Sequence, residues 1–237
     1  MKADNGVEHA AVTAGAEGIG QKLTVLRADR GIKVSELARQ IGVSPSLISQ
    51  IERGQSRPSV STLFAMAEAL AVPVDAFFRG TEAEAPPTAA EVTDAPAAVA
   101  ELVSRASSEP GAGRDAETDR YVVRSGGRAT LDIEGGVRWE RLTPKTLSDV
   151  EFFELVYAPG AESNPTLYRH PGREMLLMLS GRMHIHIGFE RYDLAVGDSL
   201  MFPSTMPHRY VNPGEEEARA VAVMIHDAPV PPESRNS

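Results

Sequence analysis

Hydrophobic residues in the first third of the chain recur at helical spacing, in short blocks separated by Gly and Pro. The pattern predicts helices at 19–29, 34–41, 45–53 and 61–70, with residues 74–78 closing the core as a fifth helix. Gly42 suits the left-handed turn that ends a helix, and Ser44 followed by Pro45 is a strong signal for the start of the next one. Residues 19–80 are therefore expected to form an all-α, five-helix domain.

The pattern changes at about residue 121 to short β-rich runs punctuated by Gly and Pro. Strands are predicted at 121–124, 151–157, 175–179, 183–187, 199–202 and 220–225. Many short strands at this spacing are typical of an all-β sandwich or barrel, so residues 121–228 are expected to form a second domain.

The remaining segments lack hydrophobic periodicity. Residues 1–18 are small and polar and are expected to be a disordered arm, and residues 229–237 a flexible tail. Residues 81–120 are rich in Ala, Pro and acids and hold few large apolar side chains. Such a segment buries too little surface to offset its ordering entropy, which predicts an acidic, flexible linker.

Charge and composition exclude several kinds of site and point to one segment that could approach nucleic acid. The net charge is −9, yet residues 19–80 carry eight Lys and Arg against five acids, as expected where one segment alone approaches phosphates. The absence of Cys excludes disulfides, zinc–thiolate sites and thiol nucleophiles. No apolar run has the roughly 18 residues of a membrane span, and no secretion signal stands at the N-terminus. We expect a soluble, cytoplasmic protein without membrane partners.

Two short helices joined by a Gly-containing turn describe a helix-turn-helix unit. The segment resembles the Xre type, the lambdoid-phage-repressor-like domains, through Leu37-Ala38, Gly42-Val43-Ser44, Ser49-Gln50-Ile51-Glu52-Arg53-Gly54 and Pro58. The resemblance implies that the second helix of the pair enters the major groove and that Arg27 and Glu52 form an interhelical ion pair. An alternative, a protein–protein module, is disfavoured by the local positive charge.

The same resemblance assigns candidate DNA contacts. The residues expected near bases are Ser44, Pro45, Ser46, Ser49 and Gln50. Gln50 is the best reader among them, because a carboxamide can pair bidentately with adenine. The candidates for phosphate contacts, which position the domain without reading sequence, are Arg39, Arg53 and Arg57.

Candidate chemistry in the second domain centres on His170, Glu174 and His208. For His170 and Glu174 to share a face, the Pro-Gly step between them must fold back as a turn. His184 and His186 alternate with apolar residues that should face the interior, so these two histidines are expected to point outward. Tyr210 shares a face with His208, lining the pocket or packing in the core.

The domain resembles the cupins through two motifs. The residues that carry the resemblance are Gly160, Tyr168, His170, Glu174 and Gly181, then Gly197, Pro203, His208 and Asn212. The resemblance implies a jelly-roll barrel that commonly holds one divalent metal (zinc, iron, nickel or manganese), with His170, Glu174 and His208 as ligands. Tyr168 stands where a further histidine would be, and a neutral phenol is a poor ligand, so Tyr168 is expected to bond a ligand or water. In a metal-free alternative the same residues line a polar pocket.

The pairing of the two domains resembles bacterial-type transcription regulators with a cupin sensor. We expect a homodimer that reads a palindromic operator in double-stranded DNA and responds to a small-molecule effector or a metal, and we do not expect an enzyme. Dimerisation is expected through the cupins, with the 81–120 segment setting the separation of the DNA-reading domains. The alternative is a non-haem iron oxygenase or epoxidase with a retained helix-turn-helix, because two histidines and one carboxylate suffice for such a centre.

Overall fold

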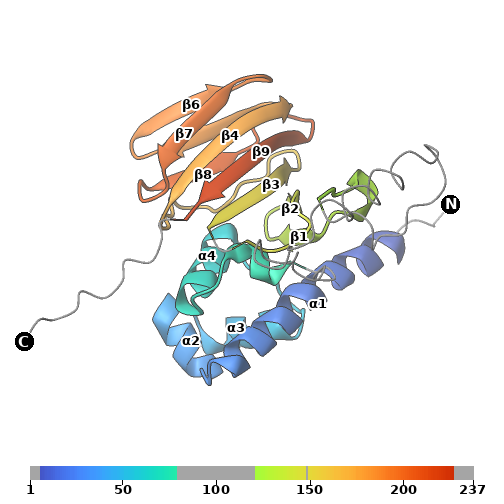
Figure 1. The fold of residues 1–237 in the computed structure, drawn as a ribbon, viewed down its shortest axis with the longest axis vertical. Helices are drawn as coiled ribbons and strands as arrows, with labels where there is room; N and C mark the ends of the chain where they lie inside the picture. Colours follow the sequence, from blue (N-terminus) through green and yellow to red (C-terminus); the bar gives the residue numbers. More distant parts are fainter. Residues whose placement is uncertain (1–5, 79–120, 148, 227–237) are drawn as a thin grey trace, which may run out of the picture.

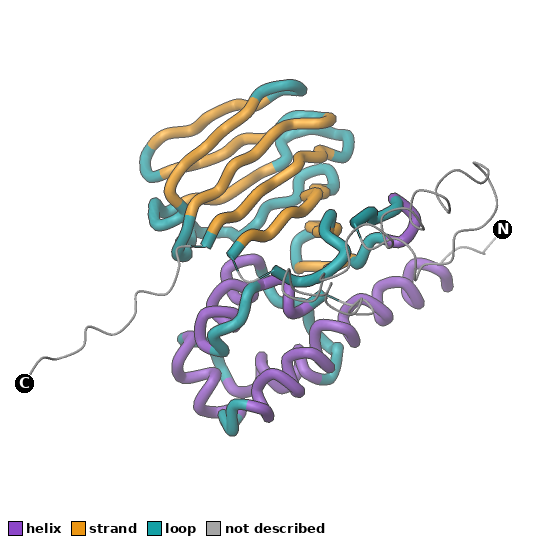
Figure 2. The backbone as a smooth tube through the Cα atoms, viewed as in Figure 1, coloured by secondary structure: helices purple, strands orange, loops and turns teal. Residues whose placement is uncertain are grey.

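The computed structural model describes residues 6–78, 121–147 and 149–226. Its helical half contains α1 (Gly6–Asp29), α2 (Val34–Ile41), α3 (Pro45–Glu52), α4 (Val60–Ala69) and the 3₁₀ helix η1 (Val74–Phe77). The β-rich half follows it along the chain, and α4 lies where the two halves meet (Figures 1 and 2). The predicted linker at 81–120 and tail at 229–237 lie outside the described residues.

Two expectations about the helical half are wrong. The described residues contain four α-helices instead of five, because 74–77 forms a single 3₁₀ turn after Pro73, too short for an α-helix. The predicted disordered arm at 1–18 is also wrong from Gly6 onward, where α1 already begins. Residues 6–18 contain four alanines and no proline, and Ala has the highest helix propensity, so the helical backbone extends from the periodic segment toward the N-terminus.

The helix-turn-helix pair has the predicted caps. Gly42 ends α2 with φ 73°, and its N–H donates to the carbonyl of Ala38. The hydroxyl of Ser44 accepts from the N–H of Leu47 at 3.1 Å, and Pro45 opens α3. The predicted ion pair is present, with Nε of Arg27 2.7 Å from Oε1 of Glu52. This pair ties α1 to α3 and holds the second helix of the motif in place.

Nine antiparallel strands form two sheets in the described part of the β-rich half. The six-stranded sheet has the order β1 (Thr130–Ile133), β2 (Val137–Arg141), β3 (Val150–Tyr157), β9 (Ala218–Ile225), β4 (Arg173–Ser180) and β7 (Ser199–Pro203). The three-stranded sheet has the order β6 (Glu190–Leu194), β5 (Met183–Ile187) and β8 (His208–Val211). Five of the six predicted strands are present, whereas 121–124 is not a strand and β1, β2, β6 and β8 were not predicted.

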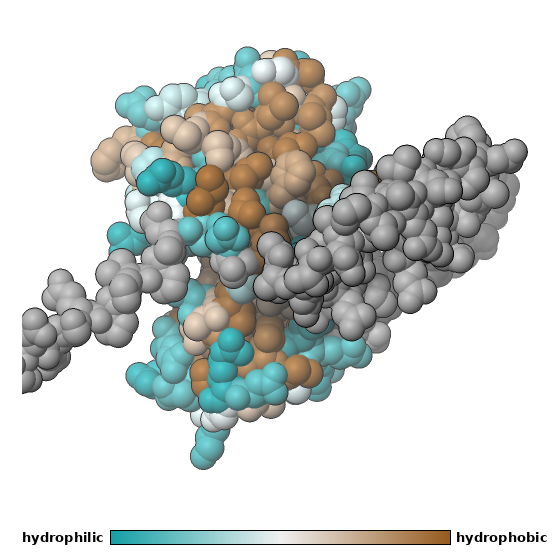
Figure 3. Space-filling view, in the orientation of Figure 1, coloured by the Kyte–Doolittle hydropathy of each residue, from teal (hydrophilic) through white to brown (hydrophobic). Residues whose placement is uncertain are grey.

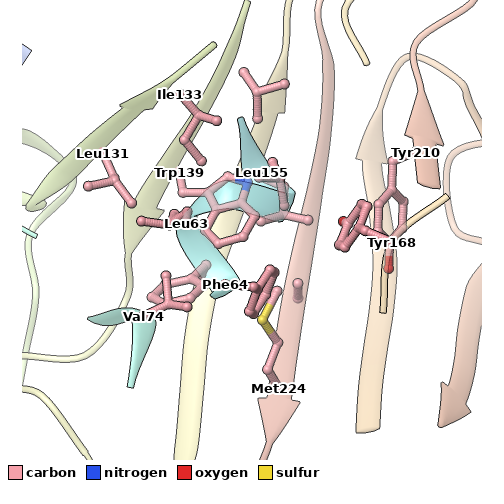
Figure 4. Close-up of a cluster of buried hydrophobic side chains, with 14 of the residues drawn as sticks. Leu63, Phe64, Val74, Leu131, Ile133, Trp139, Leu155, Tyr168, Tyr210 and Met224 are labelled. Atoms are coloured by element: carbon pink, nitrogen blue, oxygen red, sulfur yellow. The ribbon is translucent and has the colours of Figure 1, made fainter. Parts of the chain in front are cut away.

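The two halves share one continuous hydrophobic core. Phe78, directly after η1, stacks on Phe153 of β3 with ring centroids 5.0 Å apart. The hydroxyl of Ser61 in α4 donates to Oδ1 of Asn164 at 2.8 Å. Figure 4 shows side chains of the helical half, Leu63, Phe64 and Val74, among those of the sheet. The sequence predicts two domains on a long linker, and the structure packs them directly together.

Among the helices in the described ranges, none combines the length and the apolar character that crossing a bilayer demands.

Candidate functional site

Helix α3 presents a polar surface to solvent. Ile48 and Ile51 are buried on its inner face and fix its orientation. Of the residues expected near bases, four are exposed and Ser49 is half-buried; the exposed ones are Ser44, Pro45, Ser46 and Gln50. A helix that buries one face and exposes a polar start can lay that start in a groove of DNA.

The three candidate phosphate-binding arginines differ in their surroundings. Arg39 is exposed on α2 and forms a bidentate pair with Glu36, at 2.6 and 3.1 Å. A hydrogen bond from Arg39 lowers the pKa of the Glu36 carboxyl. Nε of Arg53, also exposed, donates to Oε1 of Gln55 at 3.0 Å, and Arg57 is half-buried. Arg39 and Arg53 are therefore accessible, and a phosphate would compete with the side chains they now contact.

In the β-rich half, His170, Glu174 and His208 come together. Their ligand atoms all lie within 4.8 Å of one another, and all three residues are buried. His170 lies just before β4, Glu174 lies on β4, and His208 begins β8 on the other sheet. Nε2 of His170 is 2.6 Å from Oε1 of Glu174, and Nε2 of His208 is 3.3 Å from the same oxygen. The donor cluster, as we call these three side chains, therefore joins the two sheets.

The predicted Pro-Gly turn is what brings His170 beside Glu174. Gly172 has φ 104°, and a Cβ there would lie 2.4 Å from the carbonyl oxygen of Ile225 in the next strand. Only glycine fits that position without moving the backbone of β9. The backbone of His170 is held as well, because its N–H donates to the carbonyl of Ser204 at 3.1 Å.

Both histidines of the donor cluster are oriented by backbone carbonyls. Nδ1 of His170 is 3.1 Å from the carbonyl oxygen of Pro171, and Nδ1 of His208 is 2.8 Å from that of Met206. An Nδ1–H donated to a carbonyl leaves the lone pair of Nε2 directed at Glu174. Within the described residues, neither Nε2 nor Oε1 of Glu174 has a hydrogen-bond partner. Three buried lone-pair donors that converge without a shared hydrogen fit one divalent cation.

The charge of Glu174 is maintained at this site. Burial alone would raise the pKa of its carboxyl, but when Nε2 of His170 and His208 carries a proton, the hydrogen bonds and charge of the two imidazoles hold that pKa well below its usual range. The second oxygen, Oε2, accepts a hydrogen bond from the hydroxyl of Tyr210. Burial and the nearby Glu174 carboxylate raise the pKa of Tyr210 well above its usual value, so the phenol stays neutral and able to donate.

Tyr168 lies against the donor cluster. Its ring centroid is 4.5 Å from that of His208, and the two residues exchange backbone hydrogen bonds of 3.0 and 2.8 Å. Burial raises the pKa of the Tyr168 hydroxyl well above its ordinary value. A neutral phenol is a poor metal ligand, and Tyr168 packs against His208.

His184 and His186 do not join the donor cluster. Burial alternates along β5, with Met183, Ile185 and Ile187 buried and the two histidines only half-buried. The prediction that both histidines point away from the interior is confirmed. Nε2 of His184 lies 3.5 Å from Oδ1 of Asp193 on the neighbouring strand.

Phe64 is a residue of the site that was not predicted from the sequence. Its ring stacks on that of His170, with centroids 3.7 Å apart and 7° between the planes. A pocket of about 200 Å³ opens beside His170 and is lined by Glu68, Arg169, His170, Pro171 and Thr205. The helical spacing of Leu63, Met66, Ala67 and Leu70 defines the inward face of α4, and a large aromatic residue off that face, such as Phe64, indicates a second packing partner.

Both halves match known families. A helix-turn-helix family model matches residues 25–77, and a cupin domain model matches residues 153–224. The HTH-type transcriptional regulator SutR of Escherichia coli is 24% identical over 194 residues, covering 82% of this chain and 86% of SutR. The HTH-type transcriptional regulator y4dJ of Sinorhizobium fredii is 35% identical over 54 residues, covering 23% of this chain and 70% of y4dJ.

A solved structure shares the whole architecture. The HTH_3 family transcriptional regulator from Vibrio cholerae superposes with a TM-score of 0.58 at 20% identity, covering 92% of this chain and 99% of that one. The exposed helix-turn-helix and the donor cluster thus lie in the two parts of the chain that the family models match. The chain belongs to the Xre-type helix-turn-helix transcriptional regulators and carries a C-terminal cupin domain.

Proposed function

We propose that this regulator binds a palindromic DNA sequence as a homodimer and that its cupin site binds a small-molecule effector, a divalent metal, or both. The observation that carries the proposal is the convergence of three buried, unshared donor atoms, from His170, Glu174 and His208, in a chain that also exposes a DNA-reading helix. Such a cluster would give the regulator a binding site for the metal or effector to which it responds.

Sequence reading is assigned to the exposed start of α3. Gln50 offers a carboxamide that can pair with adenine, and Ser46 offers a hydroxyl one turn earlier. Arg39 and Arg53 border this surface and would bind phosphates, which position the domain and make its affinity depend on salt. SutR and y4dJ are both named as HTH-type transcriptional regulators, which supports this assignment.

The donor cluster fits zinc, iron, nickel or manganese as a single divalent ion. His170, Glu174 and His208 would hold it, and when bound it would supply a Lewis acid with positions open to an oxygen or nitrogen atom of an effector. Tyr210 would orient Glu174, and Tyr168 would face the bound molecule. In the metal-free alternative the same side chains form a polar pocket for the effector.

A second copy of the chain is assigned to the outer face of the six-stranded sheet. The outward-facing residues there include Met175, Leu177 and Leu179 on β4, Val221 and Val223 on β9, and Met201 on β7. Met175 pairs with both Met201 and Val223 in the sheet, so the apolar residues are contiguous. Figure 3 shows hydrophobic side chains gathered over the β-rich half. A single short helix contacts few bases, and a two-fold dimer through this face would supply a second reading helix.

Selection of binding sites from random duplex DNA tests the proposal. The full-length protein is selected at moderate salt, once with chelator and once with a divalent metal. The expected result is a palindromic site whose affinity differs between the two conditions. The absence of any preferred sequence under both conditions would refute the assignment of α3.

Iron-dependent oxidation is the second candidate function. One observation favours it: the donor cluster consists of two imidazoles and one carboxylate, the set that non-haem iron oxygenases use. Oxygen uptake by the iron-loaded protein with small organic acids, including phosphonates, measures it directly. We expect no turnover, and sustained oxygen consumption lost in Glu174→Gln would favour the enzyme.

A further inference from the structure

Helix α4 of the DNA-binding half forms part of the wall around the donor cluster. Phe64 is 6% exposed and lies parallel to the imidazole of His170 at van der Waals distance. The same ring stacks on Tyr168, with centroids 6.1 Å apart, and meets Trp139 edge-on at 5.9 Å. Figure 4 shows Phe64 beside Trp139 and Met224 of the β-rich half. A residue of the helical half thus completes the surroundings of the cupin site.

The same helix also lines the mouth of the site. Glu68 is exposed and borders the pocket of about 200 Å³ that His170 and Arg169 also line. Residues four apart share one face of a helix, so Phe64 and Glu68 lie on the same side of α4. The face of α4 that meets the β-rich half therefore contributes both to the wall and to the entrance.

A second connection joins the start of α4 to the donor cluster. The N–H of Val60 donates to the carbonyl of Ser163 at 3.3 Å. Ser163 in turn exchanges two hydrogen bonds with Tyr210, at 2.9 and 3.0 Å, and the hydroxyl of Tyr210 bonds Glu174. The middle of α4 therefore contacts His170 directly, and its first turn is linked to Glu174 through Ser163 and Tyr210.

We propose that α4 couples occupancy of the cupin site to DNA binding and that Phe64 is the residue that carries the coupling. This inference rests on the proposed function, because it requires both an occupant in the barrel and DNA on α3. An occupant bound to Nε2 of His170 fixes the plane of the imidazole, since Nδ1 is already held by Pro171. Two parallel rings in close packing cannot tilt independently, so the ring of Phe64 must follow.

Helix α4 is close in the chain to the DNA-reading helix α3, so a movement of α4 can be transmitted to it. Only residues 53–59 separate α3 from α4. Within that segment the carbonyl of Pro58 accepts from the N–H of Glu134 at 3.0 Å, so the loop is itself fixed to the β-rich half. Helix α4 also packs on α2, which packs on α3, so a displacement of α4 against the β-rich half changes the placement of the helix pair, and in a dimer it changes the separation of the two reading helices.

The test compares Phe64→Leu with a matched control in the full-length protein. Leu keeps an apolar side chain of similar reach but removes the ring that stacks on His170. Phe78→Leu is the control, because Phe78 packs across the same domain boundary, on Phe153, without a described ring contact to the donor cluster. Divalent cobalt alone is the probe, since its absorption spectrum reports coordination directly.

Two readouts are measured with and without cobalt. The first is affinity for the selected duplex. The second is the fluorescence emission of Trp139, the single tryptophan of the chain, which lies beside Phe64. The emission is measured without DNA. In the wild type, cobalt is expected to change DNA affinity about 5–150-fold and to alter the emission. In Phe64→Leu, cobalt and DNA are still expected to bind, but cobalt should change the DNA affinity by less than about twofold and leave the Trp139 emission nearly unchanged. Phe78→Leu is expected to keep both wild-type responses.

The proposal is overturned if Phe64→Leu keeps the wild-type responses, if the wild type binds cobalt and shows neither response, or if cobalt does not bind. An emission response that depends on Phe64 in a protein with no DNA preference supports the coupling through α4 and places the failure in the proposed DNA binding instead.

Discussion

The hydroxyl of Tyr210 donates a hydrogen bond to Oε2 of Glu174, the carboxylate oxygen on the side away from the two histidines of the donor cluster. Glu174 thus has one oxygen satisfied by a fixed, neutral phenol and the other left for the cluster. Partners of this kind orient a ligand and maintain its basicity. Tyr210 is therefore a positioning residue for Glu174.

Tyr210→Phe is expected to weaken metal binding about 10–100-fold, because Glu174 loses the bond that orients it. The ring remains, so packing is preserved, although one buried carboxylate oxygen loses its partner. Titration calorimetry with a competing chelator measures the affinity. Tyr192→Phe is the control, since Tyr192 is a half-exposed tyrosine on β6 and should leave the affinity unchanged. Equal affinities for Tyr210→Phe and the wild type would remove Tyr210 from this role.

Metal is expected to stabilise the folded protein, and removal of metal to destabilise it. An ion that binds only the native state adds about 2.7 kcal/mol to the free energy of unfolding at a concentration 100 times its dissociation constant. His170→Ala should lose this increment. His184→Ala should keep it, because His184 points away from the donor cluster. Urea unfolding with metal and with chelator measures the increment, and an equal increment in both variants would contradict the assigned ligand set.

Local signals predicted much of the fold and of the site. Gly42 and the Ser44-Pro45 pair marked the helix boundaries because caps depend on a few adjacent residues. Alternation along β5 placed His184 and His186 outside for the same reason. The Pro-Gly turn is a local signal that pairs His170 with Glu174, whereas only the resemblance to cupins added His208, which lies on the other sheet.

Three features were not predicted from the sequence, and only the last of them depends on contacts between distant segments: the β1–β2 hairpin, strand β6 and the packing of Phe64. The hairpin of β1 and β2 turns at Gly135 and Gly136, both with positive φ, and such a Gly-Gly pair is typical of a two-residue hairpin turn. Strand β6 is mostly exposed, so it lacks the hydrophobic pattern on which strand prediction depends. The stacking of Phe64 on His170 joins residues more than 100 positions apart, and neither motif contains Phe64.

Substitutions on the reading surface should separate base recognition from phosphate binding. Gln50→Ala is expected to relax preference at one base pair by about 1–3 kcal/mol, because a bidentate pair is lost. Arg53→Ala is expected to weaken binding about equally for all sequences and to reduce the salt dependence by about one phosphate contact. Competition binding against single-base variants of the selected site, at several salt concentrations, distinguishes the two effects. Unchanged base preference in Gln50→Ala would exclude Gln50 from the reading set.

Dimerisation through the outer face of the six-stranded sheet is tested with Leu177→Asp. Leu177 is 43% exposed on β4 and pairs with Val221, so a carboxylate there would be buried in the proposed interface without a partner. The variant is expected to sediment as a monomer and to bind a half-site and the full palindrome with similar affinity.

Phe189→Asp is the matched control for that experiment, because Phe189 is fully exposed in the turn between β5 and β6, away from this face. It removes more exposed apolar surface than Leu177→Asp does and adds the same charge, and it should remain a dimer that prefers the palindrome. Sedimentation of both variants at the same concentration separates loss of the interface from a general effect of charge. A dimeric Leu177→Asp protein would place the two-fold contact on another surface, and the spacing of the selected half-sites would then have to be explained by that contact.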